Sequence, residues 1–311
     1  MMKLRLFSKN SAKAAPNSLK KLSPAHSLWL TVLLFSLWGC NLLPSEPTYT
    51  SENIAESVVK IAREEYQLNL VSKLIGQTLW IYLPLEEDLF VDSDKPLESI
   101  SRFDFKQAEG ILKEKTLSFV YDIREIPETK ESQNKKFNPE AGKKINKVLR
   151  CVRRVVFSLK REINGPRFFT VVTADTKNGF ELTDTTYIDD LKKVLYEMIS
   201  WTEYQYRTVE DIKLAPEAIG DLEGGHLEFY DVNFERFLID QIKQRLRIKF
   251  SRSSELPKAG SVDIEKEVLK SIKTVFKIYN FSDFLTLDIY NLASEKKISF
   301  SKAMVLEKNK E

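Results

Sequence analysis

The stretch Phe168-Phe-Thr-Val-Val-Thr-Ala-Asp-Thr-Lys-Asn-Gly-Phe-Glu-Leu-Thr-Asp-Thr-Thr-Tyr187 carries the clearest structural signal in the chain. Two runs rich in Phe, Val and Thr, over residues 168–174 and 180–187, flank Asn178-Gly179. An Asn-Gly pair between two strand-forming runs is the strongest short-range signal of a β-hairpin. We therefore predict two antiparallel strands joined by a tight turn.

A long amphipathic helix is predicted before this hairpin, from about residue 139 to residue 162. Apolar residues recur there every three or four positions, which places them on one helix face. They are Ile145, Val148, Leu149, Val152, Val155, Val156 and Leu159. Gly165-Pro166 ends the pattern, because proline cannot continue a helix. The order of elements is helix, strand, turn, strand.

The same order is predicted twice more. A helix over residues 51–66 precedes strands at 68–75 and 78–83, and a helix over 262–279 precedes strands at 284–292 and 298–306. The fold class that follows is α+β, with antiparallel sheets or hairpins packed against helices and with this unit repeated three times.

Weaker patterns lie between these units. They predict an acidic loop at 86–96, a short helix at 103–114, a strand at 117–126, a polar linker at 127–139, a helix from Asp189 or Asp190 through Trp201 toward Arg207, a short strand at 227–230, and a helix at 234–250. With breaks at Pro127–Pro139 and Pro257–Gly260, we predict α+β units over 54–127 and 139–256 and a helix-hairpin unit over 261–311.

The start of the chain has the pattern of a secretory signal. Residues 27–39 are uncharged and mostly apolar, and the residues before them carry only Lys and Arg charges. A basic segment followed by a short apolar run is typical of a signal peptide, because a spanning helix needs about 17–25 apolar residues. The alternative is an uncleaved signal anchor extended through Leu42 and Leu43.

The end of this run, Leu37-Trp38-Gly39-Cys40, resembles the lipobox of bacterial lipoproteins. The resemblance implies removal of residues 1–39 as a signal peptide and acylation of Cys40, which would anchor the chain to a membrane. Trp38 departs from the small residue usual at its position, which bears on processing efficiency. Asn41 implies the outer membrane, facing the periplasm, rather than retention in the inner membrane. Residues 40–53 are predicted to be a tether.

The composition of the rest of the chain argues against several classes of function. Of 48 Lys and Arg residues six lie before Gly39, so 42 remain against 45 Asp and Glu, and nucleic-acid binding gains no support from net charge. Two Cys residues, one of them acylated, provide no disulfide framework. One His remains after processing, which argues against a multi-histidine metal site. No cofactor motif is present, and we expect no cofactor.

The helix at 139–162 is strongly basic. Residues 130–161 hold eleven basic and two acidic side chains, whereas residues 181–240 hold five basic and fifteen acidic. A solvated face neutralised within the chain is one interpretation, and contact with anionic lipid or an acidic envelope partner is the other. The candidate contact residues are Lys143, Lys147, Arg150, Arg154 and Arg161.

Other candidates are single residues or small clusters. His226 with Asp221, Glu223 and Glu228 is considered as a metal or acid-base site, although an ordinary polar loop is favoured. Cys151 is expected to be a small buried residue, and the aromatic residues near 201–207 are expected to pack in the core rather than to form a glycan-stacking platform.

We therefore expect a lipid-anchored cell-envelope protein that acts as a binding, scaffold or assembly module, with no catalytic or metal residues to single out. The alternative is an envelope hydrolase that uses carboxylates such as Asp184, Asp189 or Asp190. A small-molecule carrier is a third hypothesis, and it requires a closed apolar cavity.

Overall fold

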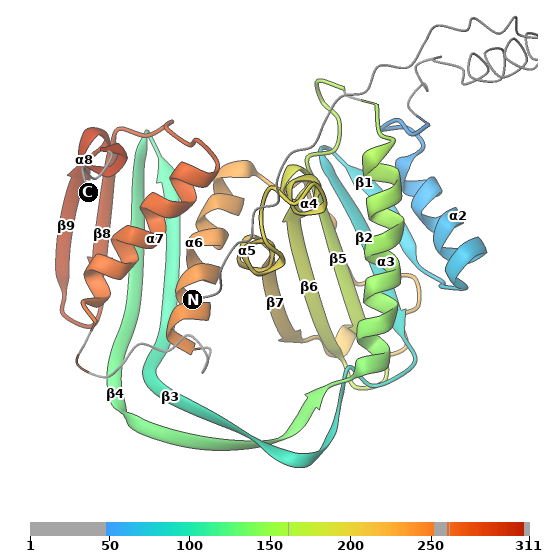
Figure 1. Cartoon of the computed structure of the whole chain (residues 1–311), viewed down its shortest axis with the longest axis horizontal. Coiled ribbons are helices and arrows are strands. Elements are labelled where there is room, and N and C mark those ends of the chain that lie inside the picture. The colour runs from blue at the N-terminus through green and yellow to red at the C-terminus, as the bar shows by residue number, and fades with distance from the viewer. Residues whose placement is uncertain (1–47, 161, 252–259, 261, 308–311) are drawn as a thin grey trace, which may run out of the picture. The chain divides into compact units, whose positions relative to one another are not determined.

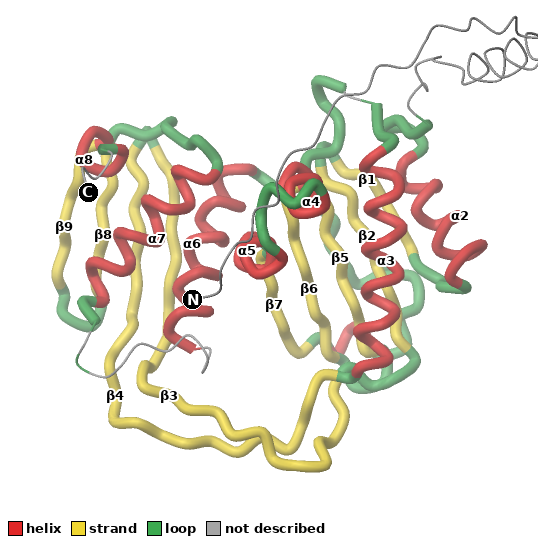
Figure 2. Tube along the Cα trace, viewed as in Figure 1, coloured by secondary structure: helices red, strands yellow, loops and turns green. Residues whose placement is uncertain are grey.

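The computed structural model describes residues 48–160, 162–251, 260 and 262–307, and these residues form an α+β fold, as predicted. They contain seven α-helices, nine strands and a short 3₁₀ helix (Figures 1 and 2). The helices are α2 (Ile54–Tyr66), α3 (Pro139–Phe157), α4 (Ile188–Leu195), α5 (Trp201–Arg207), α6 (Phe234–Ser251), α7 (Ile264–Ile278) and α8 (Lys302–Leu306). The strands are β1 (Val71–Ile75), β2 (Thr78–Leu85), β3 (Phe90–Lys113), β4 (Thr116–Phe137), β5 (Phe168–Asp175), β6 (Phe180–Tyr187), β7 (Val209–Leu214), β8 (Thr286–Asn291) and β9 (Lys296–Ser301).

Sheet 1 has the strand order β1-β2-β5-β6-β7. The β1–β2 and β5–β6 hairpins are antiparallel, as the sequence predicts, and β7 extends the sheet antiparallel to β6. The two hairpins meet through parallel pairing of β2 with β5, so the sheet is mixed rather than purely antiparallel. Gly179, at φ +69°, occupies the left-handed conformation that the β5–β6 turn requires.

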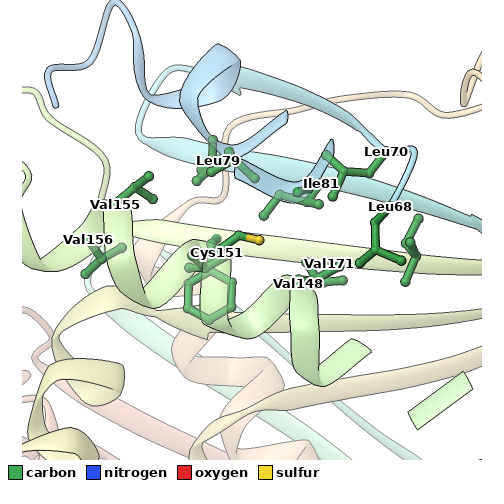
Figure 3. Close-up of a cluster of buried hydrophobic side chains, with 14 of the residues drawn as sticks. Leu68, Leu70, Leu79, Ile81, Val148, Cys151, Val155, Val156 and Val171 are labelled. Carbon is green, nitrogen blue, oxygen red and sulfur yellow. The ribbon is translucent and has the colours of Figure 1, made fainter. Parts of the chain in front are cut away.

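One face of sheet 1 is covered by helices α2, α3 and α4, which share a core with the sheet. Asn138 begins α3 by accepting a hydrogen bond from the Glu140 backbone N–H at 3.0 Å, and Pro139 follows at the first helical position, where its missing N–H costs nothing. Figure 3 shows the predicted apolar stripe of α3 directed at the strands, with Cys151 buried between Val148 and Val155.

Sheet 2 has the strand order β3-β4-β8-β9 and repeats the arrangement of sheet 1: two antiparallel hairpins joined by a central parallel pair, here β4 with β8. Helices α6 and α7 bury their apolar faces against it. Gly110 of β3 allows a close approach of α6, because a Cβ at this position would lie 3.0 Å from Cγ2 of Ile239.

The predicted three units share their sheets. The β1–β2 and β5–β6 hairpins of the first two units combine in sheet 1, and the hairpin of the third unit, β8–β9, pairs with the β3–β4 hairpin, most of which belongs to the predicted first unit. The element order helix, strand, turn, strand itself is confirmed in α2-β1-β2, α3-β5-β6 and α7-β8-β9. The described residues belong to one compact unit.

Three of the four predictions between residues 86 and 139 were wrong, whereas the strand predicted at 117–126 lies within β4 and is confirmed. The loop at 86–96, the helix at 103–114 and the linker at 127–139 are instead largely parts of β3 and β4, which form one long hairpin (Figure 2). A polar two-stranded stretch leads into an apolar one that belongs to sheet 2. Residues 103–114 are extended because they pair with β4, and their local sequence alone does not predict this conformation.

Two prolines explain why the polar part of this hairpin resembled a linker. Pro96 and Pro127 lie at two of the three places where the β3–β4 register shifts, between Asp92 and Leu97 and between Ser101 and Phe103. Proline cannot donate a ladder hydrogen bond, and irregular positions are those where a strand tolerates it.

Three smaller corrections concern other elements. The predicted helix from Asp189 to Arg207 is two helices, α4 and α5, separated by a turn in which Glu197 has φ +57°. Residues 227–230 form no strand, whereas Val209–Leu214, for which no element was predicted, form β7. The last predicted strand ends at Ser301, because α8 begins at Lys302.

Candidate functional site

The face of sheet 1 that helices α2, α3 and α4 do not cover carries a pocket of about 610 Å³, which we call the sheet pocket. Its walls are strands β6 and β7, helix α6 and residues 221–233, which we call the crossing segment. The apolar part of the lining consists chiefly of Trp80, Val172, Leu227, Tyr230 and Phe237. The size lies within the range of about 300–1,000 Å³ that is common for ligand sites.

The crossing segment is fixed to β2 by hydrogen bonds along its length. Trp80 donates from Nε1 to the carbonyl of Tyr230 at 2.7 Å, and the hydroxyl of Tyr82 donates to the carbonyl of Asp221 at 2.6 Å. Near its end, Oδ1 of Asp231 accepts from the hydroxyl of Thr78 at 2.9 Å. These bonds explain why an irregular segment can line a pocket wall in a defined position.

A charged cluster, the His226 cluster, holds the start of the crossing segment to sheet 1. The imidazole of His226 lies between two carboxylates, with Nδ1 bonded to Asp221 and Nε2 2.5 Å from Oε1 of Glu181. Glu181, on β6, is completely buried. The ammonium of Lys213, on β7, lies 3.0 Å from the second oxygen of Glu181.

The electrostatics of this cluster favour a charged imidazolium. Burial lowers the pKa of His226, but the hydrogen bonds and negative charges of Asp221 and Glu181 outweigh burial and raise it above the usual 6.5. For Asp221, burial acts to raise the pKa, and hydrogen bonds from His226 and neighbouring backbone N–H groups hold it well below its usual 3.8. A protonated His226 beside ionised partners acts as a charged clamp and makes a poor general base.

Two carboxylates of the sheet-pocket lining, Glu181 and Asp240, have unusual surroundings. Oε2 of Glu181 is buried and accepts no hydrogen bond from the described residues, since the Lys213 ammonium is near but not in hydrogen-bonding geometry. On α6, burial raises the pKa of Asp240 against the lowering effect of Arg236, whose Nε lies 3.2 Å from it. The lining therefore offers apolar surface, acceptors and both signs of charge together.

The three carboxylates considered for a hydrolase lie in different surroundings. Asp184 is half-buried on β6 at a position next to Glu210, and burial together with the charge of Glu210 raises its pKa to about 7. Asp189 is exposed at the start of α4.

Asp190 has a structural role. Its side chain is fully buried and accepts hydrogen bonds from Arg207 Nη1 at 2.8 Å and from the Tyr279 hydroxyl at 2.7 Å. Because Tyr279 follows α7, this network joins the helices of sheet 1 to those of sheet 2. None of Asp184, Asp189 and Asp190 lines the sheet pocket.

The basic residues of α3 are placed along an outward face of the helix. Lys143 pairs with Glu140 at 2.7 Å and Arg154 pairs with Glu65, so part of the charge is neutralised within the chain. Lys147 is half-buried and Arg150 is exposed. Arg161 lies outside the described residues, as do the predicted signal peptide and Cys40.

Sequence reasoning found part of the His226 cluster. It named His226 and Asp221 but added Glu223 and Glu228, whose side chains are exposed. It missed Glu181, which lies 45 positions away in sequence and reaches His226 only through the pairing of β5, β6 and β7. The one available signal was a charged residue inside a strand-forming run.

Other singled-out residues are structural. Burial raises the pKa of the Cys151 thiol to about 11, which suits a packing role. The expectation that the aromatic residues near 201–207 pack in the core is correct for Tyr204, which is buried, and wrong for Trp201, which is 60% exposed at the start of α5. In the described ranges, no three His, Cys, Asp or Glu side chains are grouped as metal ligands would be.

Comparison of the chain with protein-family models, with curated proteins and with solved structures found no match. Within the part of the chain that the structure describes, no helix has both the length and the apolar character needed to cross a membrane.

Proposed function

We propose that this chain is a lipid-anchored cell-envelope protein that binds a peptide segment of an envelope partner in the sheet pocket. The observation that carries the binding role is the pocket itself, where an aromatic wall meets a buried acceptor of Glu181 and charges of both signs. A peptide supplies apolar side chains, backbone N–H donors and charged groups together, which this lining complements.

Strand β7 strengthens the choice of a peptide. It is the last strand of sheet 1, its residues 211–214 are exposed, and it forms one side of the pocket. An extended peptide can pair with such an edge and place alternate side chains in a neighbouring pocket. Arg247 of α6 donates to the carbonyl of Glu210, so the start of the edge is already occupied and the later part is the docking position.

The membrane anchor is proposed from the lipobox at Leu37–Cys40, with Asn41 favouring the outer membrane. The alternative of an envelope hydrolase has less support, because the carboxylates considered for it do not converge on the pocket and a charged His226 is a poor base. A carrier has less support as well, since the pocket lining is strongly charged rather than closed and apolar.

Site-specific photocrosslinking in the cell envelope tests the binding role. A benzophenone amino acid replaces Tyr230, an exposed residue of the pocket wall. A matched control carries it at Leu285, which is similarly exposed and lies just before β8 of sheet 2. We expect a discrete protein adduct from position 230 and none of the same mass from 285. Lys243→Glu, a charge reversal at an exposed lining position, should lower the yield. The same adducts from both positions, or none from 230, would contradict the proposal.

A further inference from the structure

An exposed apolar patch lies where the helices covering sheet 1 end. Its members are Phe157 at the end of α3, Tyr196 and Met198 after α4, and Trp201 at the start of α5. Their exposed fractions are 38%, 64%, 71% and 60%. The rings of Phe157 and Tyr196 are in edge contact, with centroids 5.2 Å apart, so the end of α3 meets the segment that follows α4 and carries Met198 and Trp201.

The described chain starts at this same place. Tyr49 forms an isolated parallel bridge with Leu159, donating to the carbonyl of Ser158 at 3.1 Å and accepting from the N–H of Lys160 at 2.8 Å. Cys40 precedes Tyr49 by nine residues, and nine extended residues reach at most about 30 Å. A lipid on Cys40 would therefore hold the membrane surface close to the patch.

Charge next to the patch suits an anionic surface. Arg153 and Arg150 precede Phe157 by four and seven positions on α3, which places all three on one helix face. Both arginines are exposed, and no ion pair joins either of them to another described residue. Aromatic residues and Met beside basic side chains are the composition of surfaces that lie in the lipid headgroup layer.

From these observations we propose that Phe157, Tyr196, Met198 and Trp201 dock onto the anionic lipid surface that holds the anchor. This inference rests on the lipid anchor of the proposed function and goes beyond it. The acyl chains supply the affinity, and the patch sets the orientation of the domain on the membrane.

Environment-sensitive fluorescence of the full-length protein tests this docking. A single nitrobenzoxadiazole label is placed at Met198→Cys, with Ile219→Cys as the matched control. Ile219 is 55% exposed and packs near Gly179, at the end of the β5–β6 hairpin opposite to Phe168 and α4. The native Cys151 is buried and remains unlabelled. The labelled proteins are reconstituted into vesicles of phosphatidylethanolamine and phosphatidylglycerol and separated by flotation.

We expect a blue shift and a severalfold rise in emission at position 198, quenching by nitroxide-labelled lipid, and no change at 219. Arg150→Glu with Arg153→Glu should reduce the response. If the protein floats but 198 remains silent or 219 responds equally, docking is overturned and the anchor stands. If the protein does not float, both the docking of the patch and the lipid anchor are contradicted. A response at 198 that needs raised protein concentration and no vesicles would indicate self-association and would likewise overturn lipid docking.

Discussion

Replacing His226 with Gln removes the imidazolium that joins the crossing segment to sheet 1. The fully buried carboxylate of Glu181 then retains only Lys213, whose side chain is half-exposed. Removing one partner of a buried ion pair costs about 3–5 kcal/mol. Because Lys213 remains, we expect the free energy of unfolding to fall by about 2–3 kcal/mol at pH 6. Adding Glu181→Gln should restore part of this loss, since the buried charge disappears.

The pKa shifts of His226 and Asp221 determine how the stability difference changes with pH. The pKa of His226 is raised by folding, so its contribution is complete below the unfolded value of 6.5 and is lost as pH rises through the folded value. The pKa of Asp221 is lowered by folding, so its contribution is complete above 3.8 and is lost as pH falls. The stability difference between wild type and His226→Gln should therefore be largest from about pH 4 to pH 6.5.

Urea unfolding at a series of pH values measures this difference. Glu223→Gln, an exposed charge change in the same segment, serves as control and should stay within about 0.5 kcal/mol of wild type. A His226→Gln variant as stable as wild type at pH 6, or a difference that grows as pH rises above 6.5, would refute the proposed clamp.

Two further predictions concern the packing of the two sheets. Asp190→Ala leaves the buried guanidinium of Arg207 with Glu203 as its remaining ion partner and should cost about 3 kcal/mol, against about 1.5 kcal/mol for Tyr279→Phe, which removes one hydrogen bond. Equal costs in urea unfolding would contradict this ranking. Gly110→Val places a side chain against Ile239 and should cost about 1–3 kcal/mol by overpacking, with partial recovery in the double variant with Ile239→Ala; a thermal unfolding midpoint unchanged in the single variant would contradict the close approach of α6.

The sequence was most informative where one element is specified by its own residues. The stripe of α3 and the Asn178-Gly179 turn require only local spacing and local backbone geometry, and both are confirmed. Hydrophobic periodicity and turn residues act over short stretches of sequence, so they predict an element without knowledge of the rest of the chain.

Local sequence patterns did not predict the pairing of strands that lie far apart in the chain. The hairpin of β3 and β4 acquires its conformation from pairing with β8 and from burial under α6, and its prolines at register shifts suggested loops. The sheet pocket depends on the same kind of information. It exists because the crossing segment passes over the strands and bonds to Trp80 and Thr78, about 150 residues earlier.

Anchoring at Cys40 underlies both proposals, and one measurement tests it directly. Full-length wild type and Cys40→Ala are expressed in a diderm bacterium, and their intact masses and membrane partitioning are compared. We predict that wild type begins at Cys40, gains the mass of attached acyl chains and enters the membrane fraction, whereas Cys40→Ala does none of these. If both proteins retain residues 1–39 and partition alike, the chain is not a lipoprotein, and the proposed envelope anchor is contradicted.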